Sequence, residues 1–396
     1  MKSQKIALEK ISRIIDCEHK TAPSDENGEY YLIGTSTLRD GVINLDDANR
    51  VSYSTYLEWT KRRKPQAGDI IISREAPVGE VGLIKEEYKV CLGQRTVLIQ
   101  PKRKTVNSSY LLYFLNSIQT KDEFSLLSTG SVVPRLNLKD LRGFRILLPS
   151  ISEQKAIAQY LDTQTAQIDC NIDLLTQKAQ RYEELKRSLI NETVTRGLDK
   201  SVPIKDSSIE WTGQIPEHWN ATAVKRLARN QDNVVQTGPF GAQLHASDYV
   251  DEGVPLILIR NVKELWIDDT EIPKITHQKA ELLSIYCLEV DDIVFSRVGS
   301  IGRIALISER EKGWMISGQM LRLRIKNNLL NKKYLIYAFS SEYVKSYISL
   351  KSLGSTRESI NTEILSNCIL LVPTYDEQIK IADYLDTKTV QIDQII

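Results

Sequence analysis

The sequence predicts a mixed α+β protein in which two repeated mixed-sheet domains are separated by a long helix of the coiled-coil type. Three features predict this fold class: an internal repeat, short β-branched runs punctuated by Gly and Pro, and about 45 consecutive residues that contain neither. The duplication also predicts a pseudo-twofold relation between the halves. With 396 residues the chain exceeds one ordinary domain, for which about 150 residues is typical.

The internal repeat is strongest at the end of each half. Residues 153–172 and 377–396, which lie 224 positions apart, are identical at 13 of 20 positions without a gap. Farther upstream the offset falls by one, so that Arg74 corresponds to Arg297. The first 60 or so residues of each half align poorly. Each half therefore combines a shared frame with a divergent segment.

Within each half, strand patterns come before a helical pattern. Short β-branched runs bounded by Gly and Pro predict strands of a mixed or antiparallel sheet. These runs are residues 69–73, 81–84, 292–295 and 304–307. Apolar spacing then predicts one amphipathic helix per half, at 110–117 and 334–341.

A long helix is predicted from Ser152 to about Arg196. Ser152 and Glu153 suit its start, and Gly197 suits its end. Apolar or small residues recur at heptad spacing, which favours packing against a partner helix. The predicted seam consists of Leu161, Ile168, Ile172, Leu175, Ala179, Tyr182, Leu185 and Leu189. At 1.5 Å per residue the helix would measure roughly 65 Å, long enough to hold two domains apart.

Composition excludes several classes of protein. The chain is 41% hydrophobic, and no apolar run approaches the roughly 20 residues of a membrane span. The N-terminus lacks the pattern of a secretory signal, and the five cysteines form no CxxC pair. We therefore expect a cytoplasmic protein without a membrane association or a zinc site. Four scattered histidines and the absence of phosphate-loop, nucleophile-elbow and HExxH motifs predict no catalysis.

The net charge of +1 conceals an uneven distribution. Residues 61–104 hold 11 Lys and Arg against 5 Asp and Glu, whereas residues 153–199 hold 6 against 8. The basic excess suits a polyanion such as DNA. A solvated surface explains the same excess equally well, and charge alone leaves both readings open.

Several motifs together resemble the specificity subunit of type I restriction-modification enzymes. They are the DIxxSR pattern at Asp69–Arg74, the helix start that begins at Glu153, the sequence Thr195-Arg-Gly-Leu198 after the long helix, and Gly213-Gln-Ile-Pro-Glu-His-Trp219 at the opening of the second half. The resemblance covers nearly the whole chain. It is specific because it joins the duplication with several separate motifs in a fixed order.

The resemblance implies a subunit that recognises DNA and performs no chemistry itself. Each of two target recognition domains would read one half of a bipartite, asymmetric site on double-stranded DNA. The long helices would set the spacing and dock two methyltransferase subunits, and restriction subunits with translocase and nuclease activity would join them. S-adenosylmethionine, ATP and magnesium would belong to those partners. The expected boundaries are 1–150 and 198–374 for the recognition domains, 151–197 for the spacer helix and 375–396 for a second helix.

Candidate DNA contacts follow from residue type and position. Arg74 and Arg297 end matched strands, and arginine commonly reads guanine, whereas glutamine can read adenine. Alternation along residues 322–326 predicts a cationic stripe that faces phosphates. The candidates are Arg74, Gln94, Arg95, Lys102, Arg103, Ser131, Arg297, Gln319, Arg322, Arg324, Lys326 and Arg357. Residues that are repeated in both halves are as well suited to maintaining the shared frame as to contacting DNA.

Two other classes of protein remain as alternatives: a coiled-coil scaffold that binds no DNA, and a standalone DNA-binding regulator. One departure from the family pattern is also informative, because Ile396 aligns with Ile172, only partway along the long helix. Counterparts of residues 173–196 are absent from the second repeat. We therefore expect the helix seam to be exposed, and the isolated chain to self-associate or to dissolve poorly without methyltransferase subunits.

Overall fold

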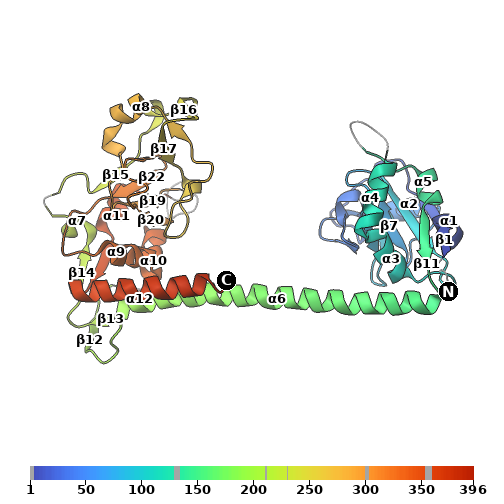
Figure 1. Ribbon diagram of the computed structural model, residues 1–396, viewed down its shortest axis with the longest axis horizontal. Helices are drawn as coiled ribbons and strands as arrows, with labels where there is room; N and C mark the ends of the chain where they lie inside the picture. Colours follow the sequence, from blue (N-terminus) through green and yellow to red (C-terminus); the bar gives the residue numbers. More distant parts are fainter. Residues whose placement is uncertain (1–3, 129–133, 210–211, 230, 299–302, 353–358) are drawn as a thin grey trace. The chain divides into compact units, whose positions relative to one another are not determined.

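The computed structural model describes residues 4–128, 134–209, 212–229, 231–298, 303–352 and 359–396. Two compact units divide the chain, Met1–Asp173 (unit 1) and Leu174–Ile396 (unit 2). Helix α6 (Ile151–Arg196) runs without interruption through the boundary and joins the units (Figure 1). Both its length and its end points agree with the sequence prediction.

Unit 1 is built on a four-stranded antiparallel sheet in the order β2-β10-β7-β8. Its strands are β2 (Ser12–Asp16), β7 (Ile70–Ser73), β8 (Val81–Leu83) and β10 (Thr96–Pro101). The strands of a second, three-stranded sheet alternate with these along the chain. In it, β3 (Tyr30–Ile33) pairs antiparallel with β6 (Asn49–Val51) and parallel with β9 (Val90–Leu92). The β-branched runs of the sequence therefore form the central strand β7 and the edge strand β8.

Unit 2 repeats this arrangement. Its main sheet has the order β15-β22-β19-β20, with β15 (Val235–Thr237), β19 (Ile293–Ser296), β20 (Ile304–Leu306) and β22 (Met320–Leu323). Strand β17 (Val254–Ile257) pairs parallel with β21 (Met315–Ile316) and antiparallel with β18 (Lys274–Ile275), as β3 does with its neighbours. The segments that align poorly in sequence thus share these strand pairings, and in unit 2 the short strand β16 adds a fourth strand beside β18.

Two helices follow the sheets in each unit. They are α3 (Ser108–Asn116) and α4 (Ile118–Leu127) in unit 1, and α9 (Lys332–Ser340) and α10 (Glu342–Ser352) in unit 2. Helices α3 and α9 confirm the two predicted helices. Helix α3 buries one face, whereas residues 334–340 of α9 are all buried, so α9 is not amphipathic as predicted. Short helices are α1 (Leu8–Ile11), α2 (Tyr53–Trp59), α5 (Leu138–Gly143), α7 (Val224–Leu227), α8 (His277–Leu282) and α11 (Thr362–Asn367).

An antiparallel strand pair closes each unit immediately before a long helix. In unit 1, β1 (Gln4–Ala7) pairs with β11 (Arg145–Leu148), and in unit 2, β14 (Asn220–Ala223) pairs with β23 (Ile369–Val372). Further short strands are β4 (Leu38–Arg39), β5 (Val42–Ile43), β12 (Ile204–Asp206), β13 (Gln214–Pro216) and β16 (Tyr249–Val250).

A buried glutamine attaches each long helix to its sheet unit. Gln154 Oε1 accepts a hydrogen bond from the backbone N–H of Asn107 at 2.9 Å, while its Nε2 donates to the carbonyls of Thr105 and Pro149. Gln378, on α12 (Tyr375–Asp393), makes the same three contacts with Asn331, Leu329 and Pro373. Burial of a polar amide requires such complete hydrogen bonding. The frame therefore fixes both helix starts identically.

The last turns of α6 pack against α12 within unit 2 (Figure 1). Ile190 and Val194 of α6 share a buried core with Ile381 and Leu385 of α12. Lys186 Nζ lies 2.7 Å from Asp393 Oδ1, so the end of α12 reaches residue 186 of α6. Gly197, at φ +70°, terminates α6 in the left-handed conformation, as the sequence predicts.

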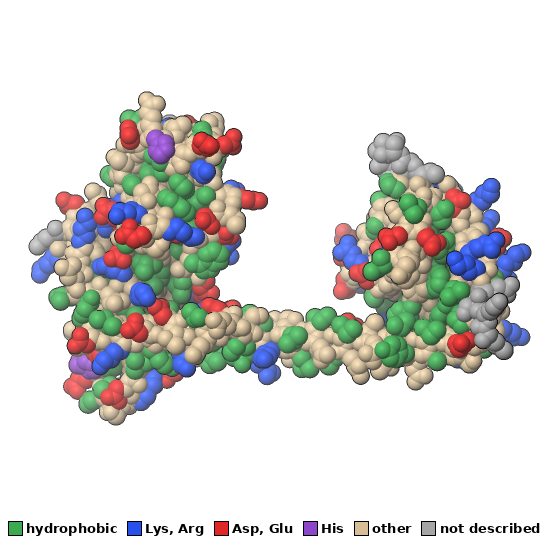
Figure 2. All heavy atoms as spheres, viewed as in Figure 1, with side chains coloured by type: hydrophobic (Ala, Val, Ile, Leu, Met, Phe, Trp, Pro, Cys, Tyr) green, Lys and Arg blue, Asp and Glu red, His purple; other side chains and the backbone are tan. Residues whose placement is uncertain are grey.

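Much of the predicted seam of α6 is exposed. Ile168, Leu175 and Leu185 are 56%, 64% and 51% exposed, whereas Leu189 packs against the core of unit 2. Figure 2 shows hydrophobic side chains along this part of α6. The partner helix that the heptad spacing predicts is therefore α12, and it covers only the final part of the seam.

Candidate nucleic-acid interface

Arg74 and Arg297 occupy the same place in the two units. The backbone N–H of Arg74 donates to the carbonyl of Arg95, its carbonyl accepts from Leu136, and its Nε donates to the Leu136 carbonyl at 2.9 Å. The matching contacts of Arg297 are made with Gln319 and Ile360, and its Nε lies 3.2 Å from the Ile360 carbonyl oxygen. The main chain of the frame thus positions both guanidinium groups in the same way.

Arg74 and the residue after it both take part in ion pairs. Its Nη1 lies 3.2 Å from Asp16 Oδ1, and the residue is 5% exposed. The adjacent Glu75 pairs with both Arg95 and Arg135, at 3.0 and 3.1 Å. The charge of Arg74 is therefore balanced within unit 1.

Strand register corrects one match made from sequence. Arg95 accepts the backbone hydrogen bond of Arg74, and Gln319 accepts that of Arg297, so Gln319 is the structural counterpart of Arg95. Gln94 and Gln319 each follow a glycine, so the sequence alone matches them with each other, and the strand register shows that this match is displaced by one residue. Gln94 is exposed, and its Nε2 lies 3.3 Å from Thr21 Oγ1.

Arg297 lines an open cavity with a volume of ≈ 910 Å³. In unit 1, the matched residues 93–95 line a smaller cavity of ≈ 320 Å³, and Arg74 is not part of its lining. The centre of the Arg297 guanidinium lies 5.2 Å from the centroid of the Phe240 ring, and Phe240 is 51% exposed. Arg260, Arg303 and Gln319 also line the larger cavity. Cations beside an exposed aromatic ring suit a nucleic-acid ligand.

The predicted cationic stripe of residues 322–326 is not continuous on the surface. Arg322 is 3% exposed, its guanidinium donates to the carbonyls of Ile285 and Asn233, and burial lowers its pKa. This expectation was wrong for Arg322, because residue 322 lies in the buried part of β22 and points at main-chain acceptors.

The other two cations of the stripe are paired with carboxylates. Arg324 contacts Asp292 and Glu289, each at 2.6 Å. Burial opposes its charge, but the hydrogen bonds to Asp292 outweigh that effect and raise the pKa of Arg324. Lys326 is exposed and lies 3.7 Å from Glu289, so it is the member of the stripe most open to a phosphate.

In unit 1, several of the cations predicted from sequence are exposed. Lys102 Nζ donates to the carbonyl of Lys10 at 2.8 Å, and Arg103 donates to the carbonyl of Ala67. Both side chains remain accessible, so their role as DNA contacts stays a prediction. The candidates Ser131 and Arg357 lie outside the described residues.

Sequence reasoning missed an aromatic cluster on β3 and α2. The rings of Tyr30 and Tyr56 stack with centroids 4.2 Å apart, and Tyr53 lies 5.6 Å from Tyr30. Lys89 and Lys64 lie over these rings at 5.8 and 5.9 Å. The signal was present as three tyrosines near the basic run 61–64, but residues 30 and 53 become neighbours only when β3 pairs with β6.

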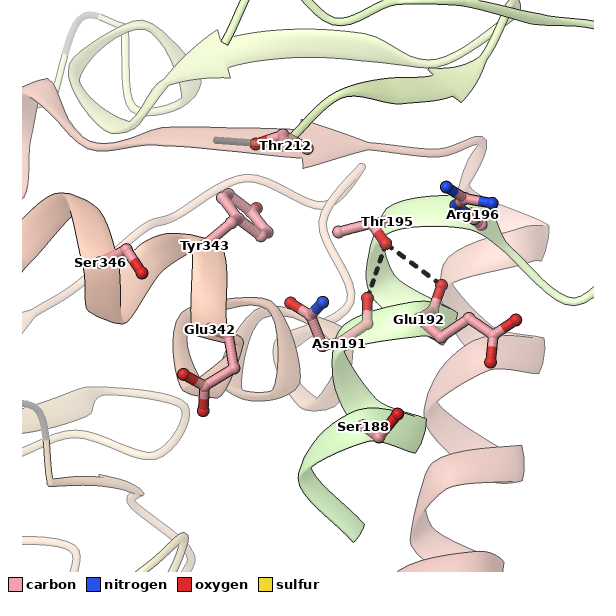
Figure 3. A pocket seen from close by; sticks show the side chains of 9 residues that line it. All are labelled: Ser188, Asn191, Glu192, Thr195, Arg196, Thr212, Glu342, Tyr343 and Ser346. Carbon is pink, nitrogen blue, oxygen red and sulfur yellow. Dashed lines mark hydrogen bonds between the residues drawn. The ribbon is translucent and has the colours of Figure 1, made fainter. Parts of the chain in front are cut away.

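A second cavity, of ≈ 380 Å³, lies between the last turns of α6 and the start of α10 (Figure 3). Its lining is polar and includes Asn191, Thr195 and Glu342. Thr195 Oγ1 donates to the Asn191 carbonyl at 2.7 Å, which turns the hydroxyl towards its own helix. This lining contains no pairing of a nucleophile with a histidine base.

The described residues contain no cluster of three or more His, Cys, Asp or Glu side chains suited to a metal ion. A search of the same residues for a helix able to cross a membrane finds none.

Comparison with known proteins identifies the family. The family model of the type I restriction modification DNA specificity domain matches residues 8–180 and 252–394, which is more than half of the chain. The chain belongs to this family. It is a DNA specificity subunit of a type I restriction-modification system, and such a subunit is not itself catalytic.

Individual relatives agree with this assignment. The MjaVIII type I restriction enzyme specificity subunit of Methanocaldococcus jannaschii is 25% identical over 368 residues, which cover 90% of this chain and 79% of that protein. Solved structures show the same fold. A chain from a study of complex assembly and conformational transition of the type I R-M system has a TM-score of 0.68 at 15% identity, covering 100% of this chain and 93% of that one. The HsdS subunit of Thermoanaerobacter tengcongensis has a TM-score of 0.54 at 14% identity, covering 99% and 90%.

Proposed function

We propose that the two units read different halves of one bipartite, asymmetric DNA site. One observation carries this proposal: the units share a topology and a set of main-chain contacts, yet their side chains differ at matched positions. Asp16 corresponds in register to Thr237, and Arg95 to Gln319. A shared frame with different reading side chains suits two different half-sites, because base edges are distinguished by side-chain donors and acceptors.

The partners of this chain follow from the same proposal. The exposed apolar seam of α6 supplies a docking surface for methyltransferase subunits, and restriction subunits complete the assembly. S-adenosylmethionine, ATP and magnesium are assigned to those partners. The support is the exposure of Ile168, Leu175 and Leu185 on a helix that joins the two units. Contiguous exposed apolar side chains are typical of protein interfaces.

An exchange of unit 1 between relatives tests whether each unit reads its own half-site. Residues 1–150 are exchanged for the equivalent residues of a relative with another specificity, and the hybrid is expressed with its methyltransferase subunits. Sequencing of methylated genomic DNA should show one changed half-site, with the other half and the spacing retained. A change in both halves would contradict independent reading by the two units.

A further inference from the structure

The clearest difference between the units is the environment of one repeated arginine. Arg74 and Arg297 are held by the same three contacts to the main chain. Identical backbone support means that differences in their chemistry arise from the neighbouring side chains.

Those neighbours differ in charge. Asp16 lies opposite Val97 on β10, and Thr237 lies opposite Leu321 on β22, at the same register position relative to the arginine strand. A carboxylate that pairs with Arg74 in unit 1 is thus replaced by a hydroxyl in unit 2. The residue after each arginine also changes, from Glu75 to Val298.

Arg297 consequently keeps an uncompensated charge at a surface cavity. Within the described residues it forms no ion pair, and its side-chain hydrogen bond uses Nε alone, with the Ile360 carbonyl. The two terminal nitrogens, Nη1 and Nη2, therefore remain as donors beside Phe240. Anchoring Nε fixes the plane of the guanidinium and reduces the entropy lost when a ligand binds.

We propose that Arg297 reads a guanine in the half-site of unit 2, and that Arg74 belongs to the frame of unit 1 without reading a base. Two coplanar N–H donors match the O6 and N7 acceptors of guanine in the major groove. Unit 2 has no carboxylate at the positions that match Asp16 and Glu75, so the guanidinium of Arg297 is available for this contact. The inference rests on the proposed function, because it requires unit 2 to bind its own half-site.

A carboxylate transplant tests the proposal. The complete chain is expressed with its methyltransferase subunits, and methylated sites are sequenced. Thr237→Asp places the unit 1 carboxylate beside Arg297, and we expect about 10- to 100-fold less preference for guanine at one position of one half-site. The rest of the motif and the spacing should be retained.

Two substitutions of Arg297 separate base reading from phosphate binding. Arg297→Lys keeps the charge but loses the planar fork, so it should relax the same position as Thr237→Asp; a phosphate contact would tolerate lysine. Arg297→Ala should also relax that position. Uniform loss of methylation at all sites, or an unchanged motif, would overturn the assignment.

Matched controls complete the experiment. Lys312→Ala removes an exposed cation from unit 2 outside the cavity and should leave the motif unchanged. Arg74→Lys should also preserve the motif, and a relaxed position in the other half-site would refute the frame role of Arg74. If the wild-type complex methylates no bipartite motif, the proposed function fails; if the motif is bipartite but insensitive to Thr237→Asp and Arg297→Lys, only this inference fails.

Discussion

At the scale of single residues, the most constrained side chains are those that hold the frame. Gln154 and Gln378 are 0% and 1% exposed, and each satisfies one N–H and two carbonyls of the main chain. Arg74 has the same character, because it contacts Leu136 and Asp16 in a buried position. Repetition of a residue in both halves therefore identifies the frame more often than it identifies the reader.

Replacement of these glutamines should destabilise one unit at a time. Gln154→Ala or Gln378→Ala leaves buried main-chain groups without partners, at a cost of about 1–3 kcal/mol. Hydrogen exchange on the intact chain should show lost protection in α3 and the first turns of α6 for Gln154→Ala, and in α9 and α12 for Gln378→Ala.

The control for this experiment is Gln159→Ala, an exposed position on α6. Surface substitutions of this kind usually change stability by less than about 0.5 kcal/mol. Equal loss of protection in all three variants would contradict the role of the buried glutamines as joints.

At the scale of elements, sequence patterns predicted the helices and strands whose residues repeat with a regular spacing. The start of α6 near Ser152, its end at Gly197 and the strands β7 and β19 follow from spacing, Gly and Pro alone. The pairing of β3 with β9 did not follow, because strands of three or four residues carry little periodic signal and their partners are distant in sequence.

The candidate site was harder to predict for the same physical reason. The sequence shows which side chains are charged. Only the tertiary structure shows which of these charges are paired with an opposite charge. Nothing local to Arg322 indicates that it is buried against main-chain carbonyls, and nothing local to Arg74 indicates Asp16, which lies 58 residues away. Arg297 lies in a matched sequence pattern to Arg74, but the strand partner that supplies a carboxylate in unit 1, Asp16, is replaced by Thr237 in unit 2.

The exposed part of α6 has a measurable consequence for the isolated chain. We expect the chain to self-associate, because water-exposed Leu175 and its seam neighbours favour contact with another helix. Leu175→Asp combined with Tyr182→Asp should return light scattering to the monomer mass. Gln180→Asp, on the same helix but outside the seam, should leave association intact.

The opposite result has an equally clear meaning. A monomer of unchanged mass in both wild type and Leu175→Asp/Tyr182→Asp would show that the seam of α6 does not drive association, and the expectation would then be wrong.

At the scale of the whole molecule, the proposed bipartite reading predicts a strong dependence on salt. Assuming about six to ten phosphate contacts, the affinity of the complex with methyltransferase subunits for its DNA site should fall about a thousandfold or more between about 50 and 200 mM salt. Fluorescence anisotropy across this range measures the slope. An affinity that does not change with salt concentration would show that contacts with DNA phosphates are not its main source.

The hydrogen bonds by which Gln154 and Gln378 attach the long helices have a consequence for how such chains evolve. Their partners are main-chain atoms of Thr105, Pro149, Leu329 and Pro373, and every amino acid presents a carbonyl at the main chain. Substitutions across the variable surfaces of either unit therefore leave the attachment intact. A lineage can exchange one reading surface for another by recombination and keep the same connecting helix, so that new DNA preferences arise without re-evolving the assembly.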